Sequence, residues 1–299
     1  YILKIAEENN ITKAAEKLFI TQSALNQQLL KLEKELGTPL FHRSRTNWRL
    51  TEAGEIYIEG AKAALQIKNT TYNRIYDVVS ARKGHLTIGL TPGRGLRMFT
   101  AIYPELHRSF PNLNVRPIEM RVRAQQDAIA KGDIDVGLMT LTQKDQTSDT
   151  YYPLKQEELV LIIPSGHPLS EKAAPSGEPL ATMDLSELRY EPFVLMDKTS
   201  TLRSSCDLLF EKAGFAPNIL FETNNTSGIA AMVQSTLCCG IIPRYYTLGL
   251  TEGVACFSLP ERPSWEIVIS CQKNGYLNSG AREFIRLARE YWENSVPLF

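Results

Sequence analysis

The sequence lacks any apolar run long enough to cross a membrane. Its longest strand-like runs, such as Leu159 to Pro164, fall far short of the ~20 residues that a membrane-spanning helix needs. It shows no secretory signal, and its five cysteines are an odd number without metal-ligand spacing. These absences argue against a membrane span and a disulfide framework, and they predict a soluble cytoplasmic protein with reduced thiols.

Signatures of catalysis are also scarce. The chain has four histidines, and they are dispersed: His42, His85, His107 and His167. His167 lies in a Gly-His-Pro turn without a nucleophile motif nearby, and neither a phosphate-binding GxxxxGK(S/T) loop nor a zinc signature occurs. The sequence therefore argues against an enzyme, and it implies no metal or cofactor.

Charge is balanced over the whole chain but not along it. The formal net charge is zero, yet residues 1–83 hold 13 Lys and Arg against 9 Asp and Glu, a net charge of +4, which leaves −4 on the remainder. At 299 residues the chain suits a small head and a larger domain, at ~100–200 residues per domain. The basic part is the N-terminal part.

The stretch from Thr12 to Gly37 predicts two helices joined by a tight turn. We expect Thr12 to cap the first helix, and Thr21 to offer its hydroxyl to the amides that open the second. Gly37, followed by Pro39, is expected to end the second helix. Its apolar stripe recurs at the helical period and consists of Leu25, Leu29, Leu32 and Leu36. The opposite, polar face carries Ser23, Asn26, Gln27 and Lys34.

Two short strands with a basic turn between them follow these helices. Residues 40–43 and 48–50 mix apolar and polar side chains, and Ser44 to Asn47 connect them. The two helices alone would fit an ordinary amphipathic hairpin equally well. The added strands make a winged helix-turn-helix the better interpretation.

A long helix is predicted after the wing, capped by Thr51 and ended before Gly84. Its small and apolar residues step by four or three, close to a heptad seam that suits pairing with a second copy. The seam consists of Ala53, Tyr57, Gly60, Ala64, Ile67, Thr71, Ile75 and Val78. The alternative is packing on its own domain, but a helix of about thirty residues is much longer than the usual ~11–12.

From Leu86 onward, short apolar strands alternate with helical segments. One set of strands and helices covers residues 86–163, and a second set covers residues 193–242. Such alternation predicts two similar α/β lobes. A strand at 266–271 and a helix at 281–293 would return the chain to the first lobe, with a cleft at the hinge.

These segments resemble the LysR-type transcriptional regulators. The stretch ITKAAEKLFITQSALNQQLLKLEKELGTPLFHRSRTNWRLTEAG is similar to the DNA-binding domain of that family, element by element and in order. The segments GHLTIGL, SFPNLNV, KGDIDVGL, EELVLIIPSGHPL, EKAGFAP and CGIIPR resemble its effector domain, which is itself similar to periplasmic binding proteins. The resemblance implies an all-α winged helix-turn-helix, a long linker helix and an α/β effector domain of two Rossmann-like subdomains.

The resemblance also implies domain boundaries and partners. The winged helix-turn-helix is expected at residues 1–51, the dimerising linker helix at 52–83, and the effector-binding domain at 84–299. Subdomain I would comprise about 86–160 and 265–299, and subdomain II about 161–264. The implied protein is a homodimer, and by family analogy a homotetramer, that binds double-stranded operator DNA and a small organic anion.

In the family, the second helix enters the major groove and the wing lies along the backbone or minor groove. DNA contacts are therefore expected from Thr21, Gln22, Ser23, Asn26, Gln27, Lys31, Lys34, Arg43, Arg45 and Arg49. Ser23 stands where the family usually has a proline, and Gln27 and Leu30 stand where it has basic residues. Fewer cations on the helix predict a shallower salt dependence of DNA binding.

Three loops are candidates for holding an effector, because they lie at the ends of predicted strands or the starts of predicted helices, where anions bind. They supply Thr91, Gly93, Arg94, Thr199, Ser200, Thr201, Arg203 and Asn224. Their hydroxyl and amide groups would hold a carboxylate, with Arg94 or Arg203 supplying charge. The alternative is that they are ordinary caps and turns. Arg121-Val122-Arg123 replaces a small polar contact of the family, which indicates a more strongly anionic ligand.

Two other functions stand beside this one. Residues 86–299 alone would suit a small-molecule binding protein of the periplasmic class without a DNA role, although the wing and the capped recognition helix argue against it. Redox sensing would need a reactive cysteine. Peroxide-sensing relatives place one where this chain has Thr201, and we expect the nearby Cys206 to be a packed thiol.

Overall fold

The computed structural model describes residues 1–44, 48–79, 83–175, 177–235, 237–250 and 252–294. The chain divides into two compact units, residues 1–79 and, apart from the turn at 131–133, residues 80–299. Among the described residues, no helix is both long and apolar enough to cross a membrane.

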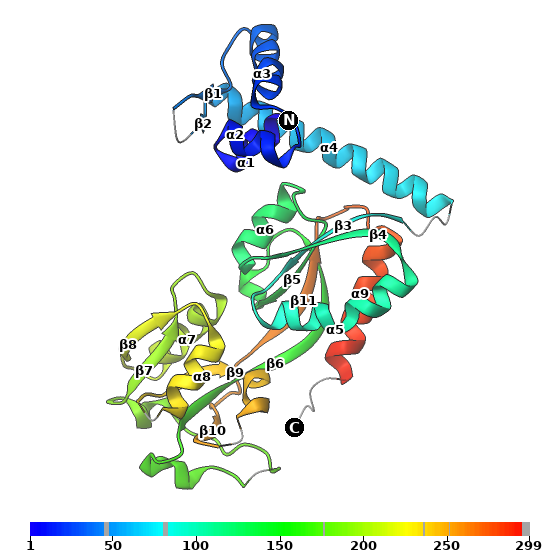
Figure 1. Ribbon diagram of the computed structural model, residues 1–299. Coiled ribbons are helices and arrows are strands. Elements are labelled where there is room, and N and C mark those ends of the chain that lie inside the picture. Colours follow the sequence, from blue (N-terminus) through cyan, green and yellow to red (C-terminus); the bar gives the residue numbers. More distant parts are fainter. Residues whose placement is uncertain (45–47, 80–82, 176, 236, 251, 295–299) are drawn as a thin grey trace. The chain divides into compact units, whose positions relative to one another are not determined.

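The first unit is a helical head with a two-stranded wing and a long helix (Figure 1). Its elements are α1 (Ile2–Glu8), α2 (Ile11–Lys17), α3 (Gln22–Leu36), β1 (Phe41–His42), β2 (Arg49–Leu50) and α4 (Glu52–Val78). The two strands pair antiparallel, with Phe41 opposite Leu50. Ile5, Leu25 and Leu29 are fully buried in the core that these elements enclose. The predicted winged helix-turn-helix is confirmed.

The predicted ends of α3 and the start of α4 are confirmed. The Thr21 hydroxyl accepts a hydrogen bond from the Ala24 amide at 3.2 Å, and the Thr51 hydroxyl accepts one from the Gly54 amide at 3.0 Å. Gly37 ends α3 with a φ of +73°, a left-handed conformation that glycine adopts without steric cost. These caps fix where α3 begins and ends and where α4 begins.

The cap of α2 corrects the prediction. Asn10, not Thr12, caps the helix: its Oδ1 accepts hydrogen bonds from the amides of Thr12 and Lys13 at 2.9 and 3.1 Å. Asparagine caps helices at least as well as threonine, and the earlier start places Ile11 in the core of the head.

The apolar stripe of α3 is shorter than predicted. Leu25 and Leu29 are fully buried, but Leu36 is 45% exposed. The helix has 15 residues whereas α1 and α2 have 7 each, so the short helices cannot cover its C-terminal end.

The predicted seam of α4 is packed at its N-terminal end and exposed farther along the helix. Ala53 and Tyr57, in its first turns, pack against the core of the head. Farther along, Ile67, Ile75 and Val78 are 69%, 49% and 84% exposed. The far part of the predicted seam is therefore left uncovered by the head.

The second unit is an α/β domain (Figure 1). Its sheet has the order β10-β6-β11-β5-β3-β4, with β9 also paired to β6, and β7 pairs with β8. The strands are β3 (Lys83–Leu90), β4 (Asn112–Glu119), β5 (Val136–Leu141), β6 (Thr150–Pro164), β7 (Pro192–Met196), β8 (Asn218–Thr223), β9 (Gly240–Pro243), β10 (Val254–Ser258) and β11 (Ser264–Cys271). The helices are α5 (Arg94–Ser109), α6 (Val122–Ala130), α7 (Thr201–Lys212), α8 (Thr226–Gln234) and α9 (Ser279–Asn294).

This unit consists of two lobes that repeat one order of elements. In lobe I the chain runs β3, α5, β4, α6, β5, and β3 pairs in parallel with both β4 and β5. In lobe II it runs β7, α7, β8, α8, β9; β7 pairs in parallel with β8 and bridges to Cys239 beside β9. The predicted pair of similar α/β lobes is confirmed.

Strands β6 and β11 belong to both lobes (Figure 1). Leu154 and Ile267 lie in the core of lobe I, whereas Leu159 and Trp265 lie in the core of lobe II. Helix α9 packs on lobe I through Trp292, so that lobe is discontinuous in sequence. The predicted subdomain limits at 160 and 265 therefore fall inside the two shared strands.

Candidate functional site

The N-terminal half of α3 presents a polar face to solvent. Its side chains carry the donor and acceptor groups that read base edges in a groove. Gln22, Ser23 and Gln27 are exposed and Asn26 is half-buried. The Thr21 and Ser23 hydroxyls lie 3.2 Å apart at the start of the helix. This is the predicted recognition face.

Arg43, at the end of β1, ties the wing to α3. Its guanidinium bonds the carboxylate of Glu33, which is only 8% exposed, and lies 5.6 Å from the ring centroid of Trp48. Glu33 also accepts a hydrogen bond from the Leu40 amide at 2.8 Å. Arg43 therefore holds the wing in place as well as offering a positive charge.

Three other basic residues predicted to contact DNA are described by the structure, and no ion pair of this kind is seen for them among the described residues. Lys31 and Lys34 on α3 and Arg49 on β2 are exposed. Arg45 lies outside the described residues. Arg49 is thus the described wing cation best suited to a phosphate, which a guanidinium binds with two parallel hydrogen bonds.

A cleft of about 360 Å³ lies between the two lobes of the second unit. It is formed by loops at the carboxyl ends of β3, β4, β7 and β8 and by the N-termini of α7 and α8, where backbone amides favour anions. Its lining residues are Thr91, Pro92, Gly93, Arg94, Arg121, Val122, Thr140, Met196, Thr199, Ser200, Thr201, Leu202, Asn224, Asn225, Thr226, Ser227, Tyr246 and Trp265. The structure thus brings together seven of the eight predicted effector residues, all except Arg203.

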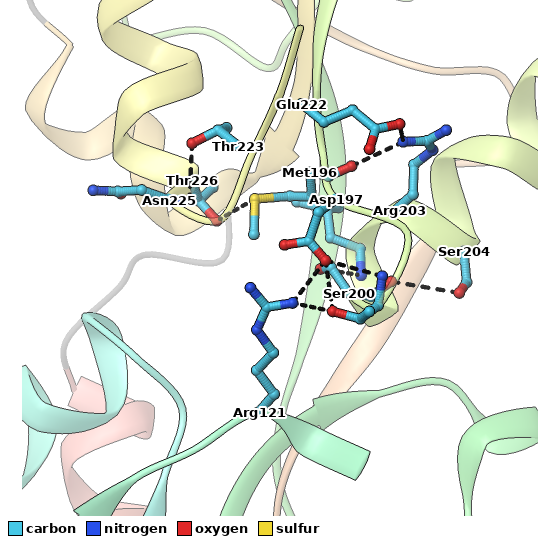
Figure 2. Close-up of polar contacts among 12 residues, drawn as sticks. Arg121, Met196, Asp197, Ser200, Arg203, Ser204, Glu222, Thr223, Asn225 and Thr226 are labelled. Atoms are coloured by element: carbon cyan, nitrogen blue, oxygen red, sulfur yellow. Dashed lines mark hydrogen bonds and ion pairs between the residues drawn. The ribbon is translucent and has the colours of Figure 1, made fainter. Parts of the chain in front are cut away.

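Arg203 is held within lobe II instead (Figure 2). It is 5% exposed and donates hydrogen bonds to Glu222 at 2.6 Å, to Asp207 at 2.7 Å and to the Met196 carbonyl at 3.0 Å. Two carboxylates neutralise its charge. The structure gives it the role of fastening α7 to β7 and β8.

Arg94 lines the cleft as half of a buried ion pair. It is 4% exposed, and its Nη1 donates to Glu157 Oε2 at 2.5 Å. The guanidinium lies 5.4, 5.1 and 5.5 Å from the ring centroids of Tyr245, Tyr246 and Trp265. Burial alone would lower the pKa of Arg94, but the neighbouring Glu157 carboxylate raises it above its ordinary value, so the guanidinium stays charged.

Glu157 is held as firmly as its partner. It is 7% exposed and accepts further hydrogen bonds from Trp265 Nε1 at 2.7 Å and from the Tyr245 amide at 3.0 Å. Since β6 and β11 carry Glu157 and Trp265, this network lies on the strands that the two lobes share.

Arg121 bridges the cleft from lobe I to lobe II (Figure 2). Its Nη1 donates to Asp197 Oδ1 at 2.6 Å and to the Thr199 hydroxyl. The hydrogen bond from Arg121 lowers the pKa of Asp197 to about 2, so this carboxylate is ionised at neutral pH. A second bond between the lobes runs from the Thr201 hydroxyl to the Thr140 carbonyl at 3.0 Å.

Smaller polar groups complete the cleft. Ser200 Oγ accepts from the Leu202 amide at 3.2 Å and Asn225 Oδ1 from the Ser227 amide at 3.0 Å, so these side chains cap α7 and α8. The Thr91 hydroxyl is buried and finds no hydrogen-bond partner among the described residues. A buried hydroxyl without a partner is costly, which favours a partner from outside the chain.

Sequence reasoning missed part of this site. Met196 ends the short apolar run from Phe193, and Asp197 follows it. They stand at the end of a strand-like segment, the kind of position that gave the candidate loops, so a signal was present. Glu157, Tyr246 and Trp265 gave none, because their role depends on β6 and β11 running through both lobes.

The cysteines do not form a reactive site. Cys206 is 1% exposed and burial raises its pKa to about 12, and burial raises that of Cys239 to about 12 as well. Reactive thiols need an exposed and electropositive setting that lowers the pKa. Among the described residues, no group of histidine, cysteine and acidic side chains has an arrangement that would hold a metal ion.

Two family models match the chain. The LysR substrate binding domain matches residues 80–293, and the bacterial regulatory helix-turn-helix protein of the lysR family matches residues 1–55. The chain belongs to the LysR family. It is 28% identical over 297 residues to the uncharacterized HTH-type transcriptional regulator YwbI of Bacillus subtilis (strain 168), covering 98% of this chain and 95% of that protein.

Solved structures of LysR-type proteins share the fold. Full-length CbnR complexed with its target DNA has a TM-score of 0.66 at 20% identity, covering 97% of each chain. The effector binding domain of QuiR in complex with shikimate has a TM-score of 0.59 at 17% identity, covering 72% of this chain and 100% of that one. This LysR protein is thus a DNA-binding transcriptional regulator with an effector-binding domain, and not an enzyme.

Proposed function

We propose that this LysR regulator reads operator DNA with α3 and the wing, and that a small organic anion bound in the cleft controls its activity. The observation that carries the effector half is the cleft itself. It gathers polar side chains, two arginines and two helix N-termini around about 360 Å³, and it contains a buried Thr91 hydroxyl that has no partner in the described part of the chain. The QuiR domain is solved with shikimate, which is a carboxylate and supports an anion of this class.

Within the DNA half, we assign base reading to the polar face of α3 and phosphate binding to the basic side chains. CbnR, solved with its target DNA, supports this use of the fold. The base-reading residues are Gln22, Ser23, Asn26 and Gln27. Thr21, Lys31, Lys34, Arg43, Arg45 and Arg49 would bind the backbone.

The proposal includes a dimer formed through α4, and a tetramer by analogy with the family. The exposed seam at Ile67, Ile75 and Val78 supports the dimer, since apolar side chains at this spacing pair helices. The expected place of action is the cytoplasm, where the operator would be met. A binding protein of the periplasmic class would have no use for the helix-turn-helix that the family model matches.

The test is a footprint with and without candidate effectors. An operator is first selected from a random DNA pool with the full-length protein, and protection is then measured with a panel of small organic acids and their neutral amides. At least one acid should change the protected region or the affinity. Thr91→Val should blunt that response and leave footprinting without effector unchanged, whereas the exposed Thr100→Val serves as the matched control.

Two outcomes would count against the proposal. A response to neutral compounds alone would show that the effector is not an anion. A response to acids that Thr91→Val and other cleft variants leave unchanged would place the effector outside the cleft.

A further inference from the structure

The two arginines of the cleft differ in how firmly they are held. Arg94 is 4% exposed, lies against three aromatic rings, and pairs with a carboxylate that is itself bonded to Trp265 and the Tyr245 backbone. Releasing it would leave Glu157 as a buried, unpaired charge, which is strongly unfavourable. Arg94 is therefore not available to exchange its partner for a ligand.

Arg121 has the opposite character. It follows β4, its side chain is 43% exposed, and its carboxylate partner Asp197 is 25% exposed. Ion pairs open to water contribute little net stability, because water screens them and also solvates the separated charges. Of the two cleft arginines, Arg121 is the one that can change partners at low cost.

Asp197 has hydrogen-bond donors that would remain if Arg121 bound another partner. Its Oδ1 accepts hydrogen bonds from the Thr199 amide at 3.0 Å and from the Thr199 hydroxyl at 2.5 Å, in the turn that leads into α7 (Figure 2). These bonds lie within lobe II and do not depend on lobe I. A carboxylate released by Arg121 therefore keeps donors of its own and stays partly exposed to water.

We propose that Asp197 is an internal competitor that occupies Arg121 in the empty cleft, and that an effector carboxylate takes its place. Arg121 is then the cation that selects carboxylates, and Asp197 sets how tightly they bind. The inference rests on the proposed effector function of the cleft. It assigns carboxylates to that site as the ligand class, Arg121 as the side chain that selects them, and Asp197 as the internal group that competes with them.

The exchange also links effector binding in the cleft to the bonds that hold the two lobes together. Arg121 belongs to lobe I and Asp197 to lobe II, so an effector that captures Arg121 removes one of the polar bonds that join the lobes across the cleft. The bond from Thr201 to the Thr140 carbonyl and the shared strands remain. A ligand that binds one arrangement of the lobes better than the other shifts the balance between them.

The experiment uses the full-length protein with sodium benzoate as the charged probe and benzamide as its neutral counterpart, at constant ionic strength. Binding is measured by calorimetry and by saturation-transfer NMR. Asp197→Asn removes the competing charge but keeps an oxygen for the Thr199 amide. It should bind benzoate at least about tenfold more tightly than wild type, since a charge-assisted bond becomes available without displacement, with no gain for benzamide.

Two further variants give the expected result its meaning. Arg121→Gln should lose benzoate affinity, and adding Asp197→Asn to it should bring no gain, because the two side chains act through each other. Asp207→Asn is the matched control. It removes a lobe II carboxylate that also pairs with an arginine, Arg203, but lies outside the cleft, and it should bind benzoate like wild type.

Several results would overturn the proposal. If Asp197→Asn binds benzoate no better than wild type while Arg121→Gln binds it worse, Arg121 selects carboxylates but Asp197 does not compete. If Asp197→Asn binds none of benzoate, succinate and acetate, the freed arginine is not a carboxylate site. Either result leaves the footprint response to the wider panel untouched, so the failure of this inference is distinguishable from the failure of the proposed function.

Discussion

The head and the cleft treat their polar side chains in opposite ways. On α3 the side chains proposed to read DNA, such as Gln22 and Gln27, project into solvent. In the cleft the charged groups are bonded to one another, Arg94 to Glu157 and Arg121 to Asp197. The face proposed to read DNA is therefore complete before DNA arrives, whereas a charged group of the cleft must give up an internal bond before it can bind a ligand.

This difference gives each region its own energetic behaviour. A face that is already solvated gains affinity from each contact it makes, and it responds to salt because counterions are released from the DNA. A cleft whose charges are already paired gains only the difference between the new bond and the old one. Affinity in the head should follow the number of contacts, and affinity in the cleft should follow which internal bond is replaced.

The largest expected effect tests whether two copies of the head bind DNA as a dimer held together by α4. Ile67→Asp or Ile75→Asp places a carboxylate in the exposed seam of α4, where pairing would bury it at high cost. Two linked recognition helices meeting half-sites ~34–36 Å apart bind cooperatively, so losing the dimer should weaken operator binding about 10²–10⁴-fold. Sedimentation and operator titration of the full chain would measure both losses.

The exposed Asn69→Asp is the control for that experiment, since it adds the same charge to α4 outside the seam. It should leave dimerisation and operator binding unchanged. The result that contradicts the seam is a wild-type fragment of residues 1–83 that sediments as a monomer at concentrations where it protects both half-sites.

The next effect contrasts the two arginines of the cleft. Arg94→Met leaves Glu157 buried without its partner and should destabilise the effector-binding domain by about 3–5 kcal/mol. Arg121→Met removes a pair that is partly open to water, with side chains 43% and 25% exposed, and should cost about 0–1 kcal/mol. Urea unfolding of the two variants measures the difference. Equal losses would mean that Arg121 is as firmly built in as Arg94.

The predictability of these features follows their distance along the chain. The caps at Thr21, Gly37 and Thr51 and the alternation of strands and helices depend on neighbours a few residues apart, and the sequence predicted them correctly. Strand β6 runs from Thr150 to Pro164, but only its apolar second half, Leu159 to Pro164, is strand-like in the sequence. Residues 150–158 show no regular alternation, and they gain their strand partners only from β11. Strand β10 was not predicted at all.

The cleft shows the same division. Loops that follow strands could be found from sequence, and they supplied most of the lining. The sequence could not show which arginine pairs with which carboxylate. Arg203 stands at the start of α7 as predicted, but its partners Glu222 and Asp207 turn it into lobe II, and Arg121 reaches the cleft in its place. Asp207 is only four residues from Arg203 on α7, but the pairings of Arg203 with Glu222 and of Arg121 with Asp197 join residues that only the fold brings together.

A smaller effect concerns base reading by α3. Asn26→Ala or Gln27→Ala should remove one bidentate contact to adenine and cost ~1–3 kcal/mol at a single base position. Selection from a random DNA pool would show this as relaxed preference at that position. Gln28→Ala, at an exposed glutamine of the same helix that lies outside the proposed set, should leave the preference intact. Equal losses on operator and random DNA would remove Asn26 and Gln27 from base reading.

The smallest effect separates two arginines of the wing. Arg49 is exposed, so Arg49→Ala should weaken binding to all DNA sequences alike and reduce the slope of log affinity against log salt by about 0.9 for one lost phosphate contact. Arg43 also pairs with Glu33, which is 8% exposed, so Arg43→Ala should lower the thermal stability of the head as well. Salt titrations with operator and random DNA, together with thermal melts, distinguish the two. If the salt slope stays unchanged in Arg43→Ala, Arg45→Ala and Arg49→Ala, the wing does not contact the DNA phosphate backbone. The DNA-binding surface of the head would then consist of α3 alone.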